Sequence, residues 1–328
     1  MKSLRAIDVP REPVEWLWRE RIPRGMISLI AGRPGVGKSL LAAHVAAEVS
    51  QAEGVIFATR EDPLRQVARP RLEAARANLK RVHFWSPNLP EDTGDLAKEI
   101  HERRAQLVVI DPIAAHLSVS VGVDQDVRRA LSPLAELAEE TGCAMLLIAH
   151  VVKYVSPSAH PLQAVGGSGG GLAGAARAVY LVGRNPSDSD ERILAIAKMN
   201  LGPEPKSLAF EIDEVEFDDG VTAGYLLALG ESDVSARALL AAGDADSECR
   251  PFEKRSRAAE FLVGYLRLGP RPAKEIREDA QQRQISWATV RRAADEVGVV
   301  KSARGGPKVT WSLPPELLAE LDDEDEAA

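Results

Sequence analysis

Short apolar runs alternate with amphipathic stretches along the first two thirds of the chain. The apolar runs predict buried strands, and they lie at residues 26–31, 55–59, 82–85, 107–110, 144–149, 179–182 and 193–197. Between the early runs, apolar residues recur at helical spacing at residues 40–50, 64–79, 96–104 and 126–140. This alternation predicts an α/β fold with a mostly parallel sheet and helices on both faces. The later segments SLAFEID and GYLLAL predict an antiparallel extension.

A phosphate-loop motif follows the first predicted strand. GRPGVGKS, at residues 32–39, fits the pattern G-x-x-x-x-G-K-S, with a strand before it and a helix after it. Backbone N–H groups of such a loop turn toward phosphate oxygens, and the helix N-terminus adds positive potential. We expect ATP and Mg²⁺ as cofactors, with Lys38 on the terminal phosphates; the alternative is a glycine-rich turn that binds nothing. The expected nucleotide-binding residues are Gly32, Pro34, Gly35, Val36, Gly37, Lys38, Ser39 and Leu40.

Two acidic residues are candidates for the chemistry at this loop. Asp111 ends the apolar run LVVID, and we expect it to serve magnesium together with the Ser39 hydroxyl. Pro112 follows Asp111, so the carboxylate that activates water must come from elsewhere. Glu61 ends the strand VIFATRED and is the first choice for orienting the attacking water, with Asp62 as the second. Each acid has a structural alternative as a cap of a strand or helix end.

The ordered set of Gly32 to Ser39, Glu61, Asp111 and His150 resembles the RecA-like ATPases. The branch it resembles is that of plasmid and phage hexameric replicative helicases of the RepA type, over residues 16–229. The resemblance implies a RecA-like P-loop NTPase core in which Glu61 is the general base and Asp111 serves magnesium. It implies that His150 senses the γ-phosphate and relays nucleotide state to DNA-binding loops. A histidine at a strand end can donate a hydrogen bond to phosphate, although a purely structural histidine remains the alternative.

The resemblance also implies a ring, expected to be a hexamer, with single-stranded DNA in its channel. Lys153 lies in the glycine-rich segment after His150 and is a candidate DNA contact there, unless this segment is a plain surface loop. In such rings a basic residue reaches the neighbouring subunit's γ-phosphate, and Arg184 and Lys198 are the candidates; the alternative is that either is an ordinary basic surface residue. Many relatives carry Lys-x-Arg where this chain has Lys198, Met199 and Asn200, which leaves the identity of that residue open.

Charge changes sign along the chain and marks its division. Residues 250–313 hold 14 basic and 7 acidic residues, whereas residues 314–328 hold 7 acids and no base. We expect an ATPase domain at 1–229, a linker at 230–252, a DNA-binding domain at 253–314 and an acidic tail at 315–328. The tail is a solvated charge run, a competitor for the basic domain, or a docking segment for a replication partner.

The basic segment predicts three helices followed by a hairpin, which resembles a winged helix. A winged helix places its third helix in the major groove of duplex DNA, and docking to a protein is the alternative use. The expected DNA contacts are Arg291, Arg292, Lys301, Arg304 and Lys308, mostly to phosphates.

Composition excludes several classes of protein. The only two cysteines, Cys143 and Cys249, are too few for a disulfide framework or a zinc site. No apolar run is long enough to span a membrane, and the first residues have no apolar signal core, so we expect a cytoplasmic protein. No N-K-x-D motif indicates GTP, and no arginine-rich lid indicates a nucleotide kinase. We favour a DNA translocase or helicase over a nucleotide-switched accessory protein of replication initiation or recombination.

Overall fold

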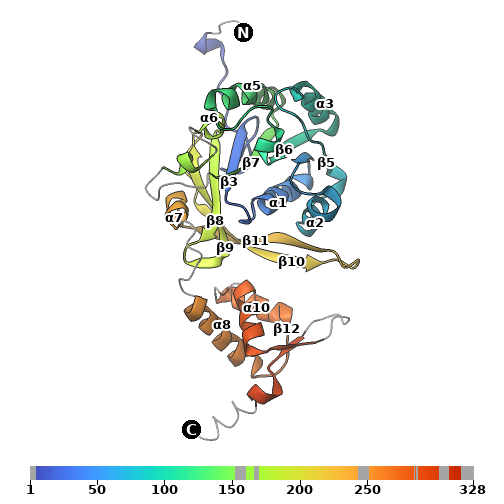
Figure 1. The fold of residues 1–328 in the computed structure, drawn as a ribbon, viewed down its shortest axis with the longest axis vertical. Helices are drawn as coiled ribbons and strands as arrows, with labels where there is room; N and C mark the ends of the chain where they lie inside the picture. Colours follow the sequence, from blue (N-terminus) through green and yellow to red (C-terminus); the bar gives the residue numbers. More distant parts are fainter. Residues whose placement is uncertain are drawn as a thin grey trace. The chain divides into compact units, whose positions relative to one another are not determined.

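The computed structural model describes residues 5–151, 160–165, 170–242, 251–283, 285, 287–302 and 310–318. The chain forms two compact units, one of residues 1–184 and 192–243 and one of residues 185–191 and 244–328. Figure 1 shows the elements of each unit in chain order.

A nine-stranded sheet is the centre of the first unit, with the order β11-β10-β9-β8-β3-β7-β6-β4-β5. The described pairings from β8 to β5 are all parallel, as the alternation of strands and helices predicts. The strands are β3 (Ile27–Gly32), β4 (Gly54–Thr59), β5 (Val82–Phe84), β6 (Ala105–Asp111), β7 (Ala144–His150), β8 (Ala178–Asn185), β9 (Asp188–Met199), β10 (Ser207–Glu216) and β11 (Thr222–Ser232). The prediction of an α/β fold with a mostly parallel sheet is confirmed.

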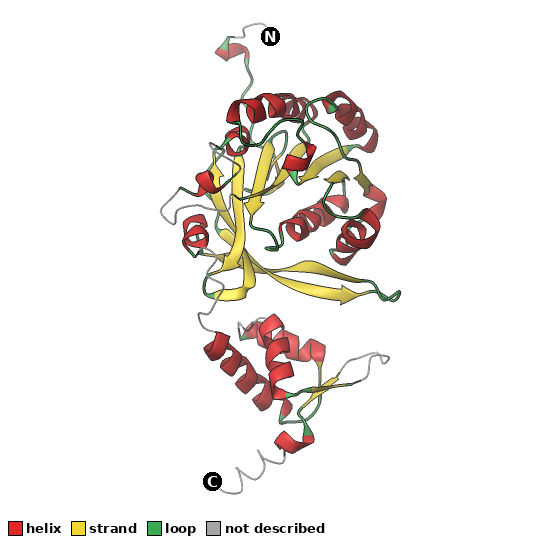
Figure 2. Ribbon diagram, in the orientation of Figure 1, coloured by secondary structure: helices red, strands yellow, loops and turns green. Residues whose placement is uncertain are grey.

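Helices cover both faces of this sheet (Figure 2). On one face, α1 (Lys38–Ser50) and α2 (Arg69–Ala74) pack Leu41, Val45 and Leu72 against the strands. On the other face, the helices α3 (Thr93–Arg103), α5 (Asp124–Thr141), α6 (Gly171–Ala175) and α7 (Ala236–Ala241) contribute to a second apolar layer. The central strands are buried on both faces, which explains their uninterrupted apolar sequences.

The helix expected at residues 64–79 is shorter and divided. A π-helical segment, η2 (Leu64–Ala68), leads into α2, and a 3-10 turn, η3 (Leu79–Arg81), comes before β5. Pro70 lies in the first turn of α2, where its missing N–H leaves no intrahelical bond unmade. A proline there favours the start of a new helix over the continuation of the preceding one.

The first unit extends beyond the boundary expected at residue 229. The antiparallel pair β10 and β11 continues to Ser232, and α7 buries Ala236 against the core. A short antiparallel pair, β1 (Trp16–Trp18) and β2 (Ile22–Pro23), lies before β3. The segment expected to be a linker, residues 230–252, therefore begins within structured chain, and its residues 243–250 lie outside the described ranges.

The described residues of the second unit form helices and a small antiparallel sheet. Its elements are α8 (Pro251–Leu266), β12 (Arg271–Pro272), α9 (Ala273–Gln282), α10 (Trp287–Val297), β13 (Val300–Lys301) and β14 (Thr310–Ser312). The sheet has the order β12-β14-β13. Leu262, Ile276, Val290 and Trp311 join the helices and the sheet in one apolar core.

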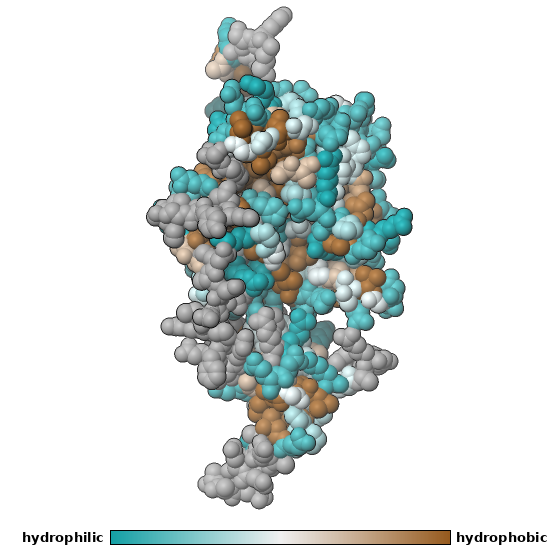
Figure 3. All heavy atoms as spheres, in the orientation of Figure 1, coloured by the Kyte–Doolittle hydropathy of each residue, from teal (hydrophilic) through white to brown (hydrophobic). Residues whose placement is uncertain are grey.

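None of the helices in the described ranges has the length and apolar character needed to span a membrane. On the face shown in Figure 3, hydrophilic residues predominate and apolar residues form separate patches.

Candidate functional site

The loop between β3 and α1 is shaped by its glycines. Gly35 and Gly37 have φ angles of 74° and 94°, in the left-handed region that glycine adopts without strain. A Cβ atom at Gly32 would lie 2.5 Å from the carbonyl oxygen of Val182 in β8, so glycine is needed there for close strand packing. The loop is followed by the N-terminus of a 13-residue helix, whose free N–H groups favour an anion. This arrangement agrees with the geometry expected of a phosphate loop.

Lys38 is buried at the start of α1. Its Nζ atom donates a hydrogen bond to the carbonyl oxygen of Arg33 at 2.8 Å. Burial lowers the pKa of Lys38, and the negative charges of Asp111 and Glu61 oppose that shift. The side chain thus folds over its own loop, between two carboxylates, where a polyphosphate would supply further negative charge.

The residues of the candidate site meet along the carboxyl edge of the sheet. Gly32 at the end of β3 lies opposite His150 at the end of β7, and Thr59 of β4 lies opposite Asp111 of β6. Because β3, β7, β6 and β4 are neighbouring parallel strands, their last residues share one edge. Glu61 follows β4 by two residues. Residues far apart in the chain are therefore brought to one site by strand order alone.

His150 lies between the lysine and the exposed acid. Its Nδ1 atom is 3.4 Å from Lys38 Nζ, and its Nε2 atom is 3.4 Å from Glu61 Oε1. A lysine ammonium can only donate, so Nδ1 accepts and Nε2 carries the proton that is donated to Glu61. Both distances are near the upper limit for a hydrogen bond. The contacts join the phosphate loop to Glu61 through one imidazole.

Asp111 occupies the buried part of the site. Asp111 is 3% exposed, and its carboxylate accepts a hydrogen bond from the Ser39 side chain. Burial raises the pKa of Asp111, and the Ser39 hydrogen bond acts in the opposite direction. Its Oδ2 atom is buried and has no hydrogen-bond partner among the described residues. A buried carboxylate oxygen without a partner is a position at which a cation or its bound water would be stabilised.

The donor set here fits magnesium better than a metal held by protein side chains alone. Within the described ranges, no group of three or more His, Cys, Asp or Glu side chains could hold a metal. Magnesium keeps most of its waters and takes few protein ligands beside phosphate oxygens. Ser39 and Asp111 provide two oxygen donors of that kind beside the phosphate loop.

The residues on either side of Glu61 are fixed by contacts of their own. Arg60 donates hydrogen bonds to the carbonyl oxygens of Ala115 at 2.7 Å, Pro87 at 3.1 Å and Ser86 at 3.3 Å. A fourth bond of 2.8 Å reaches Asn88 Oδ1. The Arg60 backbone N–H also donates to the Asp111 carbonyl oxygen at 3.2 Å. Arg60 thus joins the ends of β4 and β6 to the loop after β5.

Asp62 forms an ion pair with Arg71 of α2. Its carboxylate is therefore engaged beside the helix, whereas the Glu61 carboxylate points to His150. This difference favours Glu61 over Asp62 for contact with a water near the phosphates.

The sequence analysis did not identify the wall that the β10–β11 hairpin forms at the phosphate loop. A Cβ atom at Gly37 would lie 3.2 Å from Ile212 Cδ1, and one at Gly224 would lie 3.7 Å from Leu40 Cδ1. The antiparallel strands were expected, but nothing in their composition indicates that they reach the start of α1. Their twist and length, which place Ile212 there, depend on tertiary packing.

The two candidate basic residues lie at opposite edges of the sheet. Arg184 is near the carboxyl end of β8, two residues beyond the partner of Gly32. Lys198 is at the other edge, where its Nζ atom donates to the carbonyl oxygens of Ala173 at 2.8 Å and Ala176 at 2.7 Å. Burial, Arg177 and Arg128 lower the pKa of Lys198. In a single chain the structure does not bring Lys198 to the phosphate loop.

The proposed DNA contacts are described only in part. Lys153, Arg304 and Lys308 lie outside the described residues, and of Arg292 the structure describes the backbone in α10. Arg291 is half-buried on α10, and Lys301 forms an ion pair of 2.7 Å with Asp295 and lies over the Trp311 ring. These placements leave the DNA contacts as proposals.

Comparisons with known proteins agree with the site. A family model described as an AAA domain matches residues 2–154. The DNA repair protein RadA of Bacillus subtilis is 26% identical over 137 residues, which are 40% of this chain and 29% of RadA. RadA of Brucella abortus is 29% identical over 139 residues, again 40% of this chain and 29% of RadA. A KaiC-like protein of Pyrococcus horikoshii superimposes with a TM-score of 0.44 and 20% identity over 62% of this chain and 91% of that protein.

The chain thus matches less than a third of the length of these curated relatives. The region matched by the AAA-domain model contains the phosphate loop together with Glu61, Asp111 and His150. The fold is an α/β fold in which the phosphate loop follows β3, a central strand of a mostly parallel sheet. The matches to the AAA-domain model and to RadA support a nucleotide-dependent ATPase.

Proposed function

We propose that the protein is a Mg²⁺-dependent ATPase that couples hydrolysis to movement along DNA or to its unwinding, as a homo-oligomeric ring, most simply a hexamer. The observation that carries the proposal is the hydrogen-bonded series Lys38–His150–Glu61 beside the buried pair Ser39–Asp111. Asp111 supplies a carboxylate for the cation, and Glu61 supplies a separate carboxylate for the attacking water. His150 lies between the phosphate loop and Glu61. Phosphoryl transfer requires these parts.

Each residue has a defined part in this proposal. Backbone N–H groups of residues 32–39 hold the phosphates, and Lys38 meets the terminal ones. Ser39 and Asp111 would hold Mg²⁺, and the bound ion would supply positive charge beside the phosphate oxygens. Glu61 accepts a hydrogen bond from the attacking water and orients it toward the γ-phosphate. His150 donates to Glu61 before the nucleotide binds and to a γ-phosphate oxygen afterwards.

Exchange of the His150 partner is how nucleotide state reaches DNA in this proposal. The chain that follows His150 contains Lys153, the candidate contact for single-stranded DNA. A positively charged side chain from the neighbouring subunit, Lys198 or Arg184, neutralises part of the negative charge on the γ-phosphate. Hydrolysis therefore depends on assembly. Lys198 is preferred because its place at the far edge of the sheet suits only contact in trans.

The second unit is proposed to be a winged helix that binds duplex DNA. The element order α8-β12-α9-α10-β13-β14, with β14 between β12 and β13, supports this assignment. In it, α10 enters the major groove through Arg291 and Arg292, and Lys301, Arg304 and Lys308 contact phosphates. Lys301 must then exchange its ion pair with Asp295 for a phosphate, which costs little at the surface. The acidic tail is a candidate docking segment for a replication partner.

A nucleotide-switched accessory protein of replication initiation or recombination, without unwinding activity, is the second candidate. The observation that favours it is the similarity to proteins named for DNA repair. Both candidates use the same site, and they differ in what hydrolysis accomplishes.

Steady-state ATP hydrolysis with and without single-stranded DNA tests the proposal. We expect strong stimulation by DNA and a requirement for Mg²⁺. Unwinding of a forked duplex would support the motor, whereas nucleotide-dependent DNA binding without unwinding would support the switch. A rate of ATP hydrolysis per subunit that changes with neither DNA nor protein concentration would contradict both candidates.

A further inference from the structure

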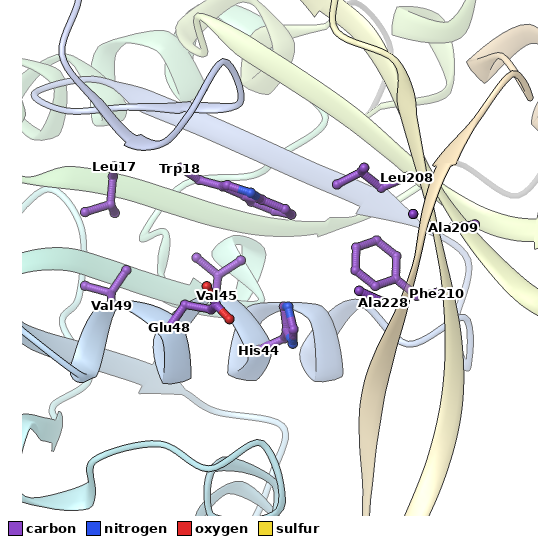
Figure 4. A pocket seen from close by; sticks show the side chains of 11 residues that line it. Leu17, Trp18, His44, Val45, Glu48, Val49, Leu208, Ala209, Phe210 and Ala228 are labelled. Atoms are coloured by element: carbon purple, nitrogen blue, oxygen red, sulfur yellow. The ribbon is translucent and has the colours of Figure 1, made fainter. Parts of the chain in front are cut away.

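A pocket of about 340 Å³ lies between the second half of α1, strand β1 and the β10–β11 hairpin. Trp18 lies above it, Phe210 closes one end, and α1 forms the floor (Figure 4). Val45 and Val49 of that floor are apolar, and Glu48 is the acid among the lining residues. The pocket therefore suits an apolar group that is accompanied by a positive charge.

The N-terminal arm, residues 5–13, carries apolar side chains that its own chain does not cover. Ile7 is 87% exposed and Val9 is 52% exposed. Every residue from 5 to 13 is exposed, and the arm's described hydrogen bonds join only arm residues, such as Arg5 with Asp8. The region matched by the AAA-domain model begins at residue 2 and thus includes this arm. Ile7 and Val9 are thus two apolar side chains on one short arm that are available for contact with another surface.

We propose that the pocket of one subunit receives the N-terminal arm of a second copy of this chain, with Ile7 and Val9 against Trp18, Val45, Val49 and Phe210. Arg11, two residues after Val9, then lies near Glu48. The arm has both the apolar side chains and the cation for which the pocket is suited. The proposal deepens the ring assembly proposed above by naming the surface through which copies join.

Restriction of the backbone at two prolines favours binding of the arm to another copy over binding to its own chain. Pro10 and Pro13 fix their own φ angles and favour extended conformations at Val9 and Glu12. In Figure 1 the arm leaves the first unit at the end away from the β10–β11 hairpin, and that hairpin forms one wall of the pocket. To fill its own pocket, the arm would have to reverse direction across these prolines. Ala6–Asp8 form a 3-10 turn and residues 9–13 are restricted by the two prolines, so the arm loses little conformational freedom when it binds another copy.

Docking at this pocket would couple assembly to the nucleotide site. The floor of the pocket is the same helix that begins with Lys38 and Ser39. The walls from β10 and β11 belong to the hairpin that contacts Gly37. An arm seated between helix and hairpin therefore fixes both sides of the phosphate loop.

Cross-linking between two singly substituted full-length chains tests the proposal. Both carry Cys249→Ser, which leaves the buried Cys143 as the native thiol. One carries Ile7→Cys in the arm and the other Ala228→Cys at the exposed rim of the pocket. We expect a short bismaleimide to give a covalent heterodimer when the two are mixed. Absence of the heterodimer would overturn the proposal, and so would a chain carrying both substitutions that cross-links internally while the two singly substituted chains do not cross-link to each other.

Sedimentation velocity of the doubly substituted Ile7→Asp/Val9→Asp protein provides a second readout. We expect its self-association to weaken at least about tenfold, because two carboxylates would enter an apolar pocket. Leu268→Asp, an equally drastic change at an exposed leucine of the second unit, should leave self-association unchanged. Unchanged association of the arm variant, or equal weakening by the control, would contradict the proposal.

The outcome is separable from that of the proposed ATPase. Binding of a fluorescent ATP analogue should persist in the arm variant, because Ile7 and Val9 lie outside the nucleotide site. If the heterodimer forms but no ATP is hydrolysed, the docking surface stands and the ATPase fails. If hydrolysis is normal and no heterodimer forms, the docking surface alone fails.

Discussion

The two halves of the nucleotide site differ in how firmly they are held. On one side, Ser39 and Asp111 are joined by a hydrogen bond in a buried setting, and Lys38 is folded over the loop at 2.8 Å. On the other side, Glu61 and His150 are partly exposed and meet at 3.4 Å. The first half is formed before any nucleotide arrives. The second half, Glu61 and His150, depends on longer and weaker contacts.

This difference suggests a division of labour. Tight contacts in a buried setting favour binding, because few groups must be ordered when the ligand arrives. Long contacts at the exposed acid allow His150 to change partner with little loss of free energy. We therefore expect substitutions in the buried half to affect binding first, and substitutions around Glu61 to affect turnover first.

Lys38→Ala should have the largest effect on ATP binding. Loss of a buried cation that faces the phosphates is expected to weaken ATP binding by about 100-fold or more. Titration with a fluorescent ATP analogue measures this, with Lys98→Ala, at an exposed lysine of α3, as the matched control. Unimpaired binding would show that residues 32–39 do not hold phosphate.

Glu61→Gln should retain ATP binding and lose turnover by about 10²–10⁴-fold, because the amide cannot take a proton from water. Single-turnover hydrolysis separates the two effects. Asp62→Asn is the matched variant, and we expect it to hydrolyse ATP. If instead Asp62→Asn is inactive and Glu61→Gln is active, the two neighbouring acids have been assigned in the wrong order.

Asp111→Asn should raise the Mg²⁺ concentration needed for half-maximal hydrolysis by about 10- to 100-fold. It should also raise the Tm of the nucleotide-free protein by about 2–4 °C, because a buried carboxylate without a full set of partners is replaced by a neutral amide. Hydrolysis at varied Mg²⁺ and thermal denaturation measure the two changes.

The pH dependence of that stabilisation follows from the raised pKa of Asp111. The folded state holds this proton at a higher pH than the unfolded state does, so stability falls as pH rises from the ordinary pKa of aspartate through the raised one. The Tm difference between Asp111→Asn and the natural protein should therefore be present at neutral pH and disappear in acid. A difference that persists unchanged in acid would mean that the carboxylate charge is not its cause.

Arg60→Met should have the smallest effect, a loss of turnover of about 3- to 10-fold with little change in KM. The substitution removes four hydrogen bonds that fix the chain around Glu61, and small displacements of a catalytic group reduce the rate. Arg60→Lys should recover part of the loss. Arg81→Met, at an arginine that bonds the distant Gln51 carbonyl oxygen, is the control. Equal losses in both variants would indicate general destabilisation.

Much of the parallel sheet could be predicted because its strands are buried on both faces and carry uninterrupted apolar runs. The meeting of Glu61, Asp111 and His150 followed from placing each at a strand's carboxyl end. Their contacts could not be derived in the same way. Whether His150 faces Glu61 or a neighbouring strand depends on strand order, which periodicity does not specify.

Other features were beyond prediction for the same reason. Arg60 has no motif, and its role depends on loop carbonyl oxygens that come together only in the fold. Lys198 and Arg184 looked equivalent near strand ends, but the reversal of the chain between β8 and β9 separates them. A count of basic residues could not show that Lys301 pairs with Asp295 of its own unit.

The position of β7 limits how information can leave the site. This strand lies between β3 and β6 and pairs with both of them over most of its length. Sliding β7 along its neighbours would break the hydrogen bonds to both β3 and β6. His150 therefore lies at the end of a strand that is held in place on both sides. Under the proposed function, a change at the γ-phosphate would be transmitted by rotation of the imidazole and by the backbone just beyond it, a short and local route rather than a displacement of the whole sheet.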